Sequence, residues 1–320
     1  MPDPCFDVTT FGEMLLRLSV PSGERLENAH QLAVHPAGAE ANVLTLLARL
    51  ERKTSWAGAL PNNPLGRRAL NALRAAEVDT SHVIWSETGR MGTYYVEFGE
   101  VPRGIQVTYD RADSCTTQLN PDAINWDSLL NTRLLHLTGI TPALSASCRE
   151  IVIQAVGRAR ENNIPVSFDV NYRQKLWTEI EARETLLPLM QNAELLFCSQ
   201  ADAKRLFNCT GPMQEVAQGM LELTKAHSVI VTFGAQGTLL WEGKDWQHQP
   251  SQATQIVDRL GAGDALAAGV IHGWLDGDLS AGLRYGTTLA ALALTQFGDM
   301  VLTDRSELLR LSQGGSALTR

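Results

Sequence analysis

The sequence has 320 residues, of which 27 are lysine or arginine and 35 are aspartate or glutamate, so the formal net charge is −8. An acidic chain without a basic stripe argues against nucleic acid or an anionic membrane surface as the main partner. The first residues lack the basic start and apolar run of a signal peptide, and no apolar stretch is long enough to cross a bilayer. We therefore expect a cytoplasmic protein.

Five scattered cysteines, at positions 5, 115, 148, 198 and 209, contain no C-x-x-C pair and no Cys/His cluster at zinc spacing. This usage predicts reduced thiols rather than disulfides or a metal site.

Short β-branched runs alternate with helical patterns through most of the chain. Ser147 and Glu150 have the spacing of a capping box at one helix start. The alternation predicts an α/β fold with an open, mostly parallel sheet covered on both faces, and no linker interrupts it, so we expect one compact domain over residues 1–320. Strands are expected at 6–11, 53–59, 134–138, 165–170, 195–198 and 229–233, and helices at 40–50, 64–76 and within 145–161.

One region departs from this alternation. Residues 93–98 and 105–110 flank a glycine- and proline-containing loop and predict a β-hairpin in which Tyr94 faces Tyr109, with Arg111 further along the same side. A lone hairpin is only marginally stable, so we expect it to join strands near 15–20 and 31–35 in a small sheet. Such a sheet is either a structural addition or a lid over a site, and the two tyrosines and the arginine favour a lid.

Residues 258–264, with the sequence DRLGAGD, precede a strong helix former. The free amides and positive dipole of a helix start bind anionic oxygens, and Asp264 there is suited to accept a proton from an attacking hydroxyl. The alternative is an ordinary glycine turn with Asp264 as a helix cap. Other phosphate motifs are poorer matches, because no P-loop is present and Leu266 stands where the third glycine of a dinucleotide fingerprint belongs.

Further candidates follow the predicted strands, at the sheet edge where ligands of open α/β folds gather. Each has a structural alternative: Asp169 and Asn171 as turn formers, Ser199 as a helix cap, Gly234 and Gly237 as a hairpin turn, and Arg173 in a surface salt bridge. Their joint position beside a helix-start anion site favours a nucleotide cleft. The candidates are Asp169, Asn171, Arg173, Ser199, Gly234 and Gly237.

Over nearly its whole length the chain resembles ribokinase-like sugar kinases of the phosphofructokinase-B type, and within them 2-keto-3-deoxygluconate kinases. The resemblance rests on GAGD at 261–264, GAEANV at 38–43, LHLTGITPALS at 135–145, FDVNYRQKLW at 168–177 and the late pair Gly298-Asp299. It implies a three-layer αβα domain with a small β-sheet lid. It also implies ATP-dependent phosphorylation of a sugar-acid hydroxyl, in particular conversion of 2-keto-3-deoxygluconate to its 6-phosphate.

The resemblance assigns roles residue by residue. Asp264 would be the general base, and Gly261, Ala262 and Gly263 the anion hole. ATP would arrive with a magnesium ion held largely by phosphates and water. The sugar acid would meet Gly38, Asn42, Tyr94, Tyr109, Arg111, Arg173 and Asp299; the nucleotide would meet Ser199, Thr232, Gly234, Gly237, Gly261 and Gly263.

The chain departs from the family pattern in three places. Pro36-Ala37 precede Gly38 where relatives carry another glycine, Asp110 stands where many carry an aromatic residue, and residues 199–202 read SQAD instead of Asn-x-x-Glu. The last departure leaves the protein ligands of the metal unassigned. Alternatives are a fructokinase or other sugar kinase of the same family and a non-catalytic sugar-acid sensor. A homo-oligomer formed through the lid is a further expectation, because exposed sheet edges pair readily.

Overall fold

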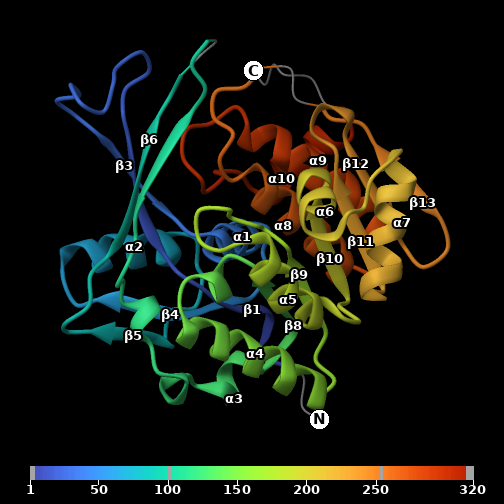
Figure 1. The fold of residues 1–320 in the computed structure, drawn as a ribbon, viewed down its shortest axis with the longest axis horizontal. Coiled ribbons are helices and arrows are strands. Elements are labelled where there is room, and N and C mark those ends of the chain that lie inside the picture. Colours follow the sequence, from blue (N-terminus) through green and yellow to red (C-terminus); the bar gives the residue numbers. More distant parts are fainter. Residues whose placement is uncertain (1–3, 100–101, 253–254, 315–320) are drawn as a thin grey trace.

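The computed structural model describes residues 4–99, 102–252 and 255–314. Its main element is a nine-stranded sheet in the order β13-β12-β11-β10-β9-β8-β1-β4-β5 (Figure 1). Neighbouring strands are parallel except at one edge, where β11, β12 and β13 pair antiparallel. The strands span Phe6–Phe11 (β1), Thr54–Pro61 (β4), Val83–Ser86 (β5), Thr132–Thr138 (β8), Val166–Asp169 (β9), Leu195–Ser199 (β10), Ser228–Thr232 (β11), Thr238–Trp241 (β12) and Trp246–Gln249 (β13).

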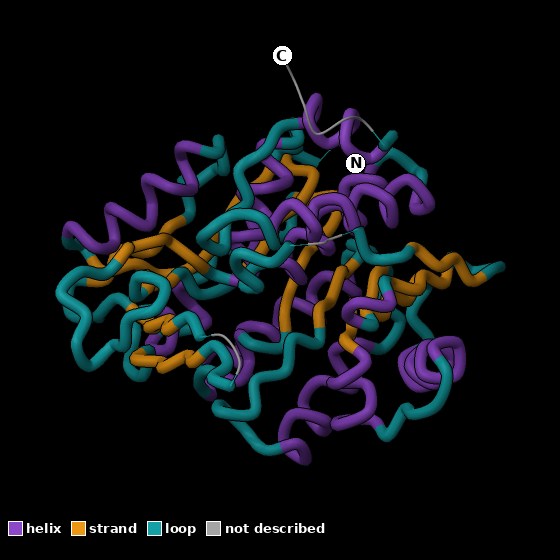
Figure 2. Tube along the Cα trace, turned by 90° about the horizontal axis from the view of Figure 1, so that it is seen from above, coloured by secondary structure: helices purple, strands orange, loops and turns teal. Residues whose placement is uncertain are grey.

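Helices cover both faces of this sheet, so the fold has three layers (Figure 2). Alternate residues of β10 show the division, because Leu196 belongs to one buried apolar cluster and Leu195 and Phe197 to the other. One cluster packs α4 (Ala146–Glu161), α5 (Glu179–Met190), α6 (Gln200–Phe207) and α7 (Met213–Thr224). The other packs α1 (Ala39–Arg49), α2 (Pro64–Ala75), α8 (Ala262–Leu275), α9 (Leu279–Ala293) and α10 (Arg305–Ser312), while α3 (Trp126–Leu129) is a single short turn.

A second sheet of four strands, the small sheet, projects beside α2 (Figure 1). Its order is β3-β2-β6-β7, built from Ala33–Ala37, Leu15–Ser19, Gly92–Glu97 and Gln106–Asp110 respectively. The predicted hairpin register is confirmed, since Tyr94 pairs with Tyr109 and Val96 with Val107. β3 begins two residues later than the predicted 31–35 strand.

The predicted capping box at the start of α4 is wrong. The helix begins two residues earlier than that spacing requires, and Ser145 is the N-cap, accepting a hydrogen bond from the Cys148 amide at 3.0 Å. The Ser147 hydroxyl donates instead to the Leu119 carbonyl. A side chain with a tertiary partner is no longer available to cap its own helix.

All five cysteines lie in described segments, and none of them is paired in a disulfide. In the described part of the chain, no helix is both long and apolar enough to span a bilayer.

Candidate active site

A cavity of 390 Å³ opens where β9, β10 and β11 end. The last residues of these strands, Asp169, Ser199 and Thr232, all line it. Parallel strands place their carboxyl ends at one edge, so residues far apart in sequence meet there. The other lining residues are Asn171, Tyr172, Arg173, Phe197, Cys198, Asp202, Arg259, Leu260, Gly261, Gly263, Asp264 and Leu266.

The first turn of α8 forms one wall of this cavity. Gly261 is the N-cap with φ +83°, and a Cβ there would lie 2.3 Å from the Asp299 carbonyl oxygen, so both its conformation and the close approach require glycine. The amide of Ala265 donates to the Gly261 carbonyl at 2.9 Å. The amides of Ala262, Gly263 and Asp264 precede this helical bond and are free to meet an anion. A Cβ on Gly263 would meet open space.

Asp264 lies in the same helical turn and lines the cavity. The Nδ2 of Asn42, on α1, donates a hydrogen bond to its Oδ2 at 2.7 Å. Burial raises the pKa of Asp264 to about 7, while the Asn42 hydrogen bond and the charge of Arg173 act in the opposite direction. A carboxyl with a pKa near neutrality is well matched to accepting a proton from an alcohol during a reaction.

Asn42 has a second feature that points to a ligand. Its side chain is only 4% exposed, and no group in the described segments bonds its Oδ1. A buried carbonyl oxygen without a partner is costly, so this oxygen is suited to accept a hydrogen bond from a ligand hydroxyl beside Asp264.

Two more carboxyls share the cavity with Asp264. Burial, followed by the charges of Asp264 and Asp202, raises the pKa of Asp169 to about 8. Burial also raises the pKa of Asp202, although its hydrogen bond with Ser199 opposes the shift. The charge of the Arg173 guanidinium opposes the upward pKa shift of all three carboxyls. Within the described ranges, no group of three or more His, Cys, Asp or Glu side chains is arranged to hold a metal ion.

A buried ionic network joins the small sheet to the loop before α8. Arg17 on β2 is fully buried and donates to Asp258 at 2.5 Å and to Asp299 at 2.7 Å. The Tyr94 hydroxyl on β6 donates to the other Asp299 oxygen at 2.5 Å. Burial and the neighbouring carboxylate raise the pKa of Tyr94 well above its usual value. Asp258 also accepts the Leu260 amide at 3.1 Å, so the network fixes the loop that leads into the anion-binding turn.

The structure gives Arg111 a partner that sequence reasoning did not supply. Its Nε donates to Glu13 at 2.8 Å, its Nη2 donates to the same carboxylate oxygen, and its guanidinium lies 5.6 Å from the Tyr109 ring centroid. Tyr109 in turn lies 5.6 Å from Tyr94 between ring centroids. Of the predicted sugar-contacting residues, Arg111, Tyr109, Tyr94 and Asp299 are therefore neighbours in space, but the charge of Arg111 is already balanced.

The predicted nucleotide-side residues divide into two sets. Ser199 and Thr232 line the cavity, and Ser199 also caps α6 by accepting the Asp202 amide at 3.0 Å. Gly234 and Gly237 lie in the turn between β11 and β12, where the Phe233 amide donates to the Gly237 carbonyl. They are not among the described residues that line the cavity, which matches the hairpin-turn alternative.

Gly38 ends the small sheet's β3 and begins α1. Its carbonyl accepts the Asn42 amide at 2.7 Å, and a Cβ would lie 2.5 Å from the Glu13 carbonyl oxygen. Ala37, where relatives carry a second glycine, is accommodated as a strand residue paired with Leu15. Gly38 therefore orients the helix that carries Asn42.

Sequence reasoning missed Arg17 and Glu13 as members of this region, and it noted Asp202 in the SQAD segment without giving it a role. For Arg17 the available signal was its position as a lone cation between apolar residues of a predicted strand. A charge that is buried in such a strand must be paired, so this position predicts an acidic partner. No comparable signal marked Glu13.

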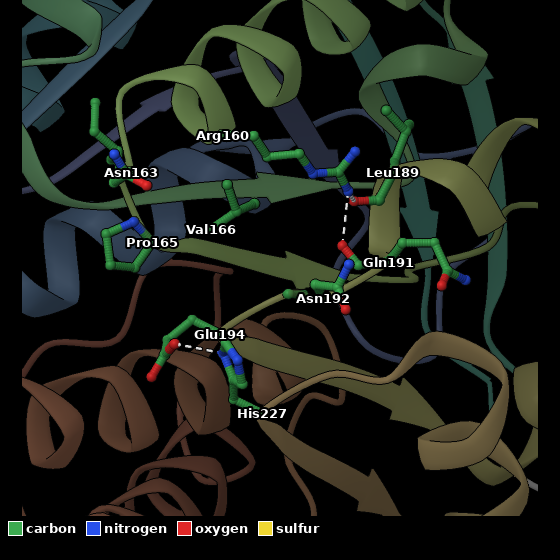
Figure 3. Close-up of a pocket in the computed structure, with 11 residues that line it drawn as sticks. Arg160, Asn163, Pro165, Val166, Leu189, Gln191, Asn192, Glu194 and His227 are labelled. Carbon is green, nitrogen blue, oxygen red and sulfur yellow. Dashed lines mark hydrogen bonds and ion pairs between the residues drawn. The ribbon is translucent and has the colours of Figure 1, made fainter.

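A second cavity, of 290 Å³, lies at the opposite ends of the same strands (Figure 3). Its cation, Arg160, donates to the carbonyls of Leu189 at 3.1 Å and Gln191 at 2.7 Å. Glu194 pairs with His227 at 2.9 Å, an interaction that a dashed line marks in Figure 3. These charged groups are engaged in holding the end of α5 and the adjacent loops, which leaves the Asp264 cavity as the better candidate for chemistry.

Comparison with known proteins agrees with this geometry. The model of the pfkB family carbohydrate kinases matches residues 6–304. The chain belongs to this family. It is therefore a sugar kinase, a phosphotransferase that uses ATP.

Two curated relatives match almost end to end. A 2-dehydro-3-deoxygalactonokinase of Haloferax volcanii is 35% identical over 97% of this chain and 98% of its own length. A 2-dehydro-3-deoxygluconokinase of Bacillus subtilis is 31% identical over 92% and 91%. The crystal structure of a Thermotoga maritima 2-dehydro-3-deoxygluconokinase superposes with a TM-score of 0.90 at 30% identity, over 97% of this chain and 98% of that one. The predicted ribokinase-like fold is confirmed.

Proposed function

We propose that this kinase transfers the γ-phosphoryl group of ATP to the 6-hydroxyl of 2-keto-3-deoxygluconate. The observation that carries the proposal is that Asp264, which is hydrogen-bonded by Asn42, lies in the first turn of α8, beside the free amides of that turn, at one cavity. The relatives named for 2-dehydro-3-deoxy sugar acids support the substrate class.

In the proposed reaction the oxygen of the sugar hydroxyl attacks the γ-phosphorus and forms the new P–O bond, while Asp264 accepts the proton of that hydroxyl. The bond between the γ-phosphorus and the oxygen of the leaving ADP breaks. The amides of Ala262 and Gly263 receive the phosphoryl oxygens at the positive end of α8. The unpaired Asn42 Oδ1 accepts a hydrogen bond from the sugar and holds the attacking hydroxyl beside Asp264. Phosphoryl transfer needs little covalent help, so positioning and charge stabilisation dominate.

Arg173 is the residue we assign to the substrate carboxylate. It is exposed at the cavity, and no hydrogen bond from its guanidinium to the described residues occupies it. A guanidinium binds a carboxylate through two parallel N–H bonds. Arg111, which the resemblance placed against the sugar acid, is balanced by Glu13, so we assign it to positioning Tyr109 instead.

The residues at the cavity fit ATP accompanied by Mg²⁺. The free amides and the open space at Gly263 suit phosphate oxygens, and Asp169 and Asp202 offer carboxylate oxygens nearby. Mg²⁺ prefers oxygen ligands and keeps much of its hydration, so it needs few protein ligands when phosphates bind it. When bound, the ion would neutralise the charge of the phosphates.

We further propose that residues 1–320 act as one domain in the cytoplasm, with the small sheet as a lid. The Arg17–Asp258 contact supports the lid, because it fixes the small sheet to the anion-binding loop. The edge strand β7 alternates exposed and half-buried residues, which supports pairing with a second copy through this sheet. Light scattering of the purified chain tests the homo-oligomer.

The deciding experiment is a substrate panel assayed by ADP release with ATP and Mg²⁺. The panel contains 2-keto-3-deoxygluconate, its 4-epimer 2-keto-3-deoxygalactonate, fructose and glucose, with Asp264→Asn as the blank. We expect the highest kcat/KM for 2-keto-3-deoxygluconate and a phosphate on C6 by NMR. Equal or higher kcat/KM for fructose would support the fructokinase alternative, and no sugar-dependent ADP release would support a sensor.

A further inference from the structure

Arg259 is an unassigned guanidinium at the edge of the active-site cavity. It lies two residues before Gly261 and lines both the Asp264 cavity and a crevice of 950 Å³ between the small sheet and the loop before α8. Phe98, Arg103 and Phe297 line the crevice with it. Its side chain is exposed, and no hydrogen bond or ion pair joins it to any residue in the described segments.

The backbone on both sides of Arg259 is fixed. Asp258 is fully buried, with one carboxylate oxygen bound by Arg17 and by the Gly298 amide at 3.2 Å, and the other bound by the Leu260 amide. The guanidinium therefore projects from an anchored loop, at the junction of the two openings.

In the described part of the chain, the cavity contains more acidic than basic side chains, and the Arg259 guanidinium has no anionic partner among them. Three carboxyls, Asp169, Asp202 and Asp264, line the cavity together with only two cations in the described segments, Arg173 and Arg259. The charge of Arg173 acts on all three carboxyls. A polyphosphate brings several further negative charges into this acidic space, and buried like charges are unfavourable unless they are paired.

We propose that Arg259 binds the β- and γ-phosphates of the nucleotide and stabilises the charge that develops on the transferring phosphoryl group. This inference rests on the proposed kinase reaction and assigns it one more catalytic residue. A guanidinium suits the role because it stays protonated and forms two parallel bonds to phosphate oxygens. An arginine so placed stabilises the transition state more than the bound substrate.

The test compares ATP with AMP, which lacks the β- and γ-phosphates. Calorimetric titration of Arg259→Gln is expected to show ATP affinity reduced about tenfold or more, with AMP affinity unchanged. Arg259→Lys should recover part of the loss. The control is Arg103→Gln, which removes the crevice arginine that pairs with Glu97 and should leave both affinities unchanged. In the sugar-acid assay, kcat of Arg259→Gln should also fall about tenfold or more.

Equal ATP affinity in wild type and Arg259→Gln would overturn the proposal, as would equal losses for ATP and AMP. The binding readout contains no sugar, so a wild-type chain that binds ATP but phosphorylates no sugar acid would contradict the proposed substrate while leaving the Arg259 test intact. A wild-type chain that binds no ATP would overturn both. Thermal unfolding of each variant verifies folding, and loss of the exposed Arg259 side chain, unpaired within the described segments, should not change the unfolding temperature.

Discussion

Removal of the Asn42 side chain should shift the pH dependence of catalysis toward higher pH. The Asn42 amide donates to Asp264 at 2.7 Å and so favours the charged carboxylate, which is the form that accepts a proton. A hydrogen bond to a charged group contributes about 1.5–3 kcal/mol, and one pKa unit corresponds to about 1.4 kcal/mol. Because Asp264 is half-buried and lines the cavity, water replaces some of the lost bond, and we expect the pKa to rise by about one unit from the value of about 7.

The assay is kcat/KM for the sugar acid between pH 5 and 9, which reports the pKa of the free enzyme. In wild type, kcat/KM should rise with pH through about 7 as Asp264 loses its proton. In Asn42→Ala the rising part of the profile should be centred near pH 8, and the maximum kcat/KM at high pH should also be lower. Thr45→Val is the matched control, because it removes a buried hydroxyl of α1 whose one hydrogen bond within the described segments goes to the Asn42 carbonyl, at 3.0 Å. An unshifted limb in Asn42→Ala would refute the coupling between the two side chains.

Three further substitutions test the site. Arg173→Ala should raise KM for the sugar acid about 10- to 100-fold and change KM for ATP little; equal increases would contradict the carboxylate role. Gly263→Ala should fold normally yet lose about tenfold or more in kcat, because its methyl group enters open space at the anion hole, whereas Gly261→Ala should lower the unfolding temperature through its clash with Asp299. Arg17→Met should lower the free energy of unfolding, measured in urea, by about 3–5 kcal/mol, because it leaves buried carboxylates unpaired; a change below about 1 kcal/mol would refute that reasoning.

Local sequence determined much of this site. The start of α8 follows from a glycine pair before a strong helix former, and the Tyr94–Tyr109 pairing follows from alternation in two short strands. The meeting of Asp169, Ser199 and Thr232 follows from the parallel sheet, whose strands end at one edge. Each of these features depends on contacts between residues close together in the sequence, or on the regular pairing of strands in a sheet.

The contacts that sequence reasoning missed are specific pairs of side chains that lie far apart in the sequence. Arg17 reaches Asp258 and Asp299 across 241 and 282 residues, and no periodic pattern encodes such a pairing. Glu13 similarly removes Arg111 from the group of available cations, although the two side chains are far apart in the chain. Tertiary packing brings the partners of a buried ion pair together. The partners therefore become evident only when the small sheet is placed against the large one.

The most direct measurement is single-turnover phosphorylation of the sugar acid by Asp264→Asn, together with ATP affinity of the same protein. The amide retains the size of the carboxyl but cannot accept the hydroxyl proton, so the rate should fall about 10²- to 10⁴-fold while ATP binds as in wild type. A variant that turns over at nearly the wild-type rate, with ATP still bound, would show that the proton goes elsewhere and that Asp264 is not the base.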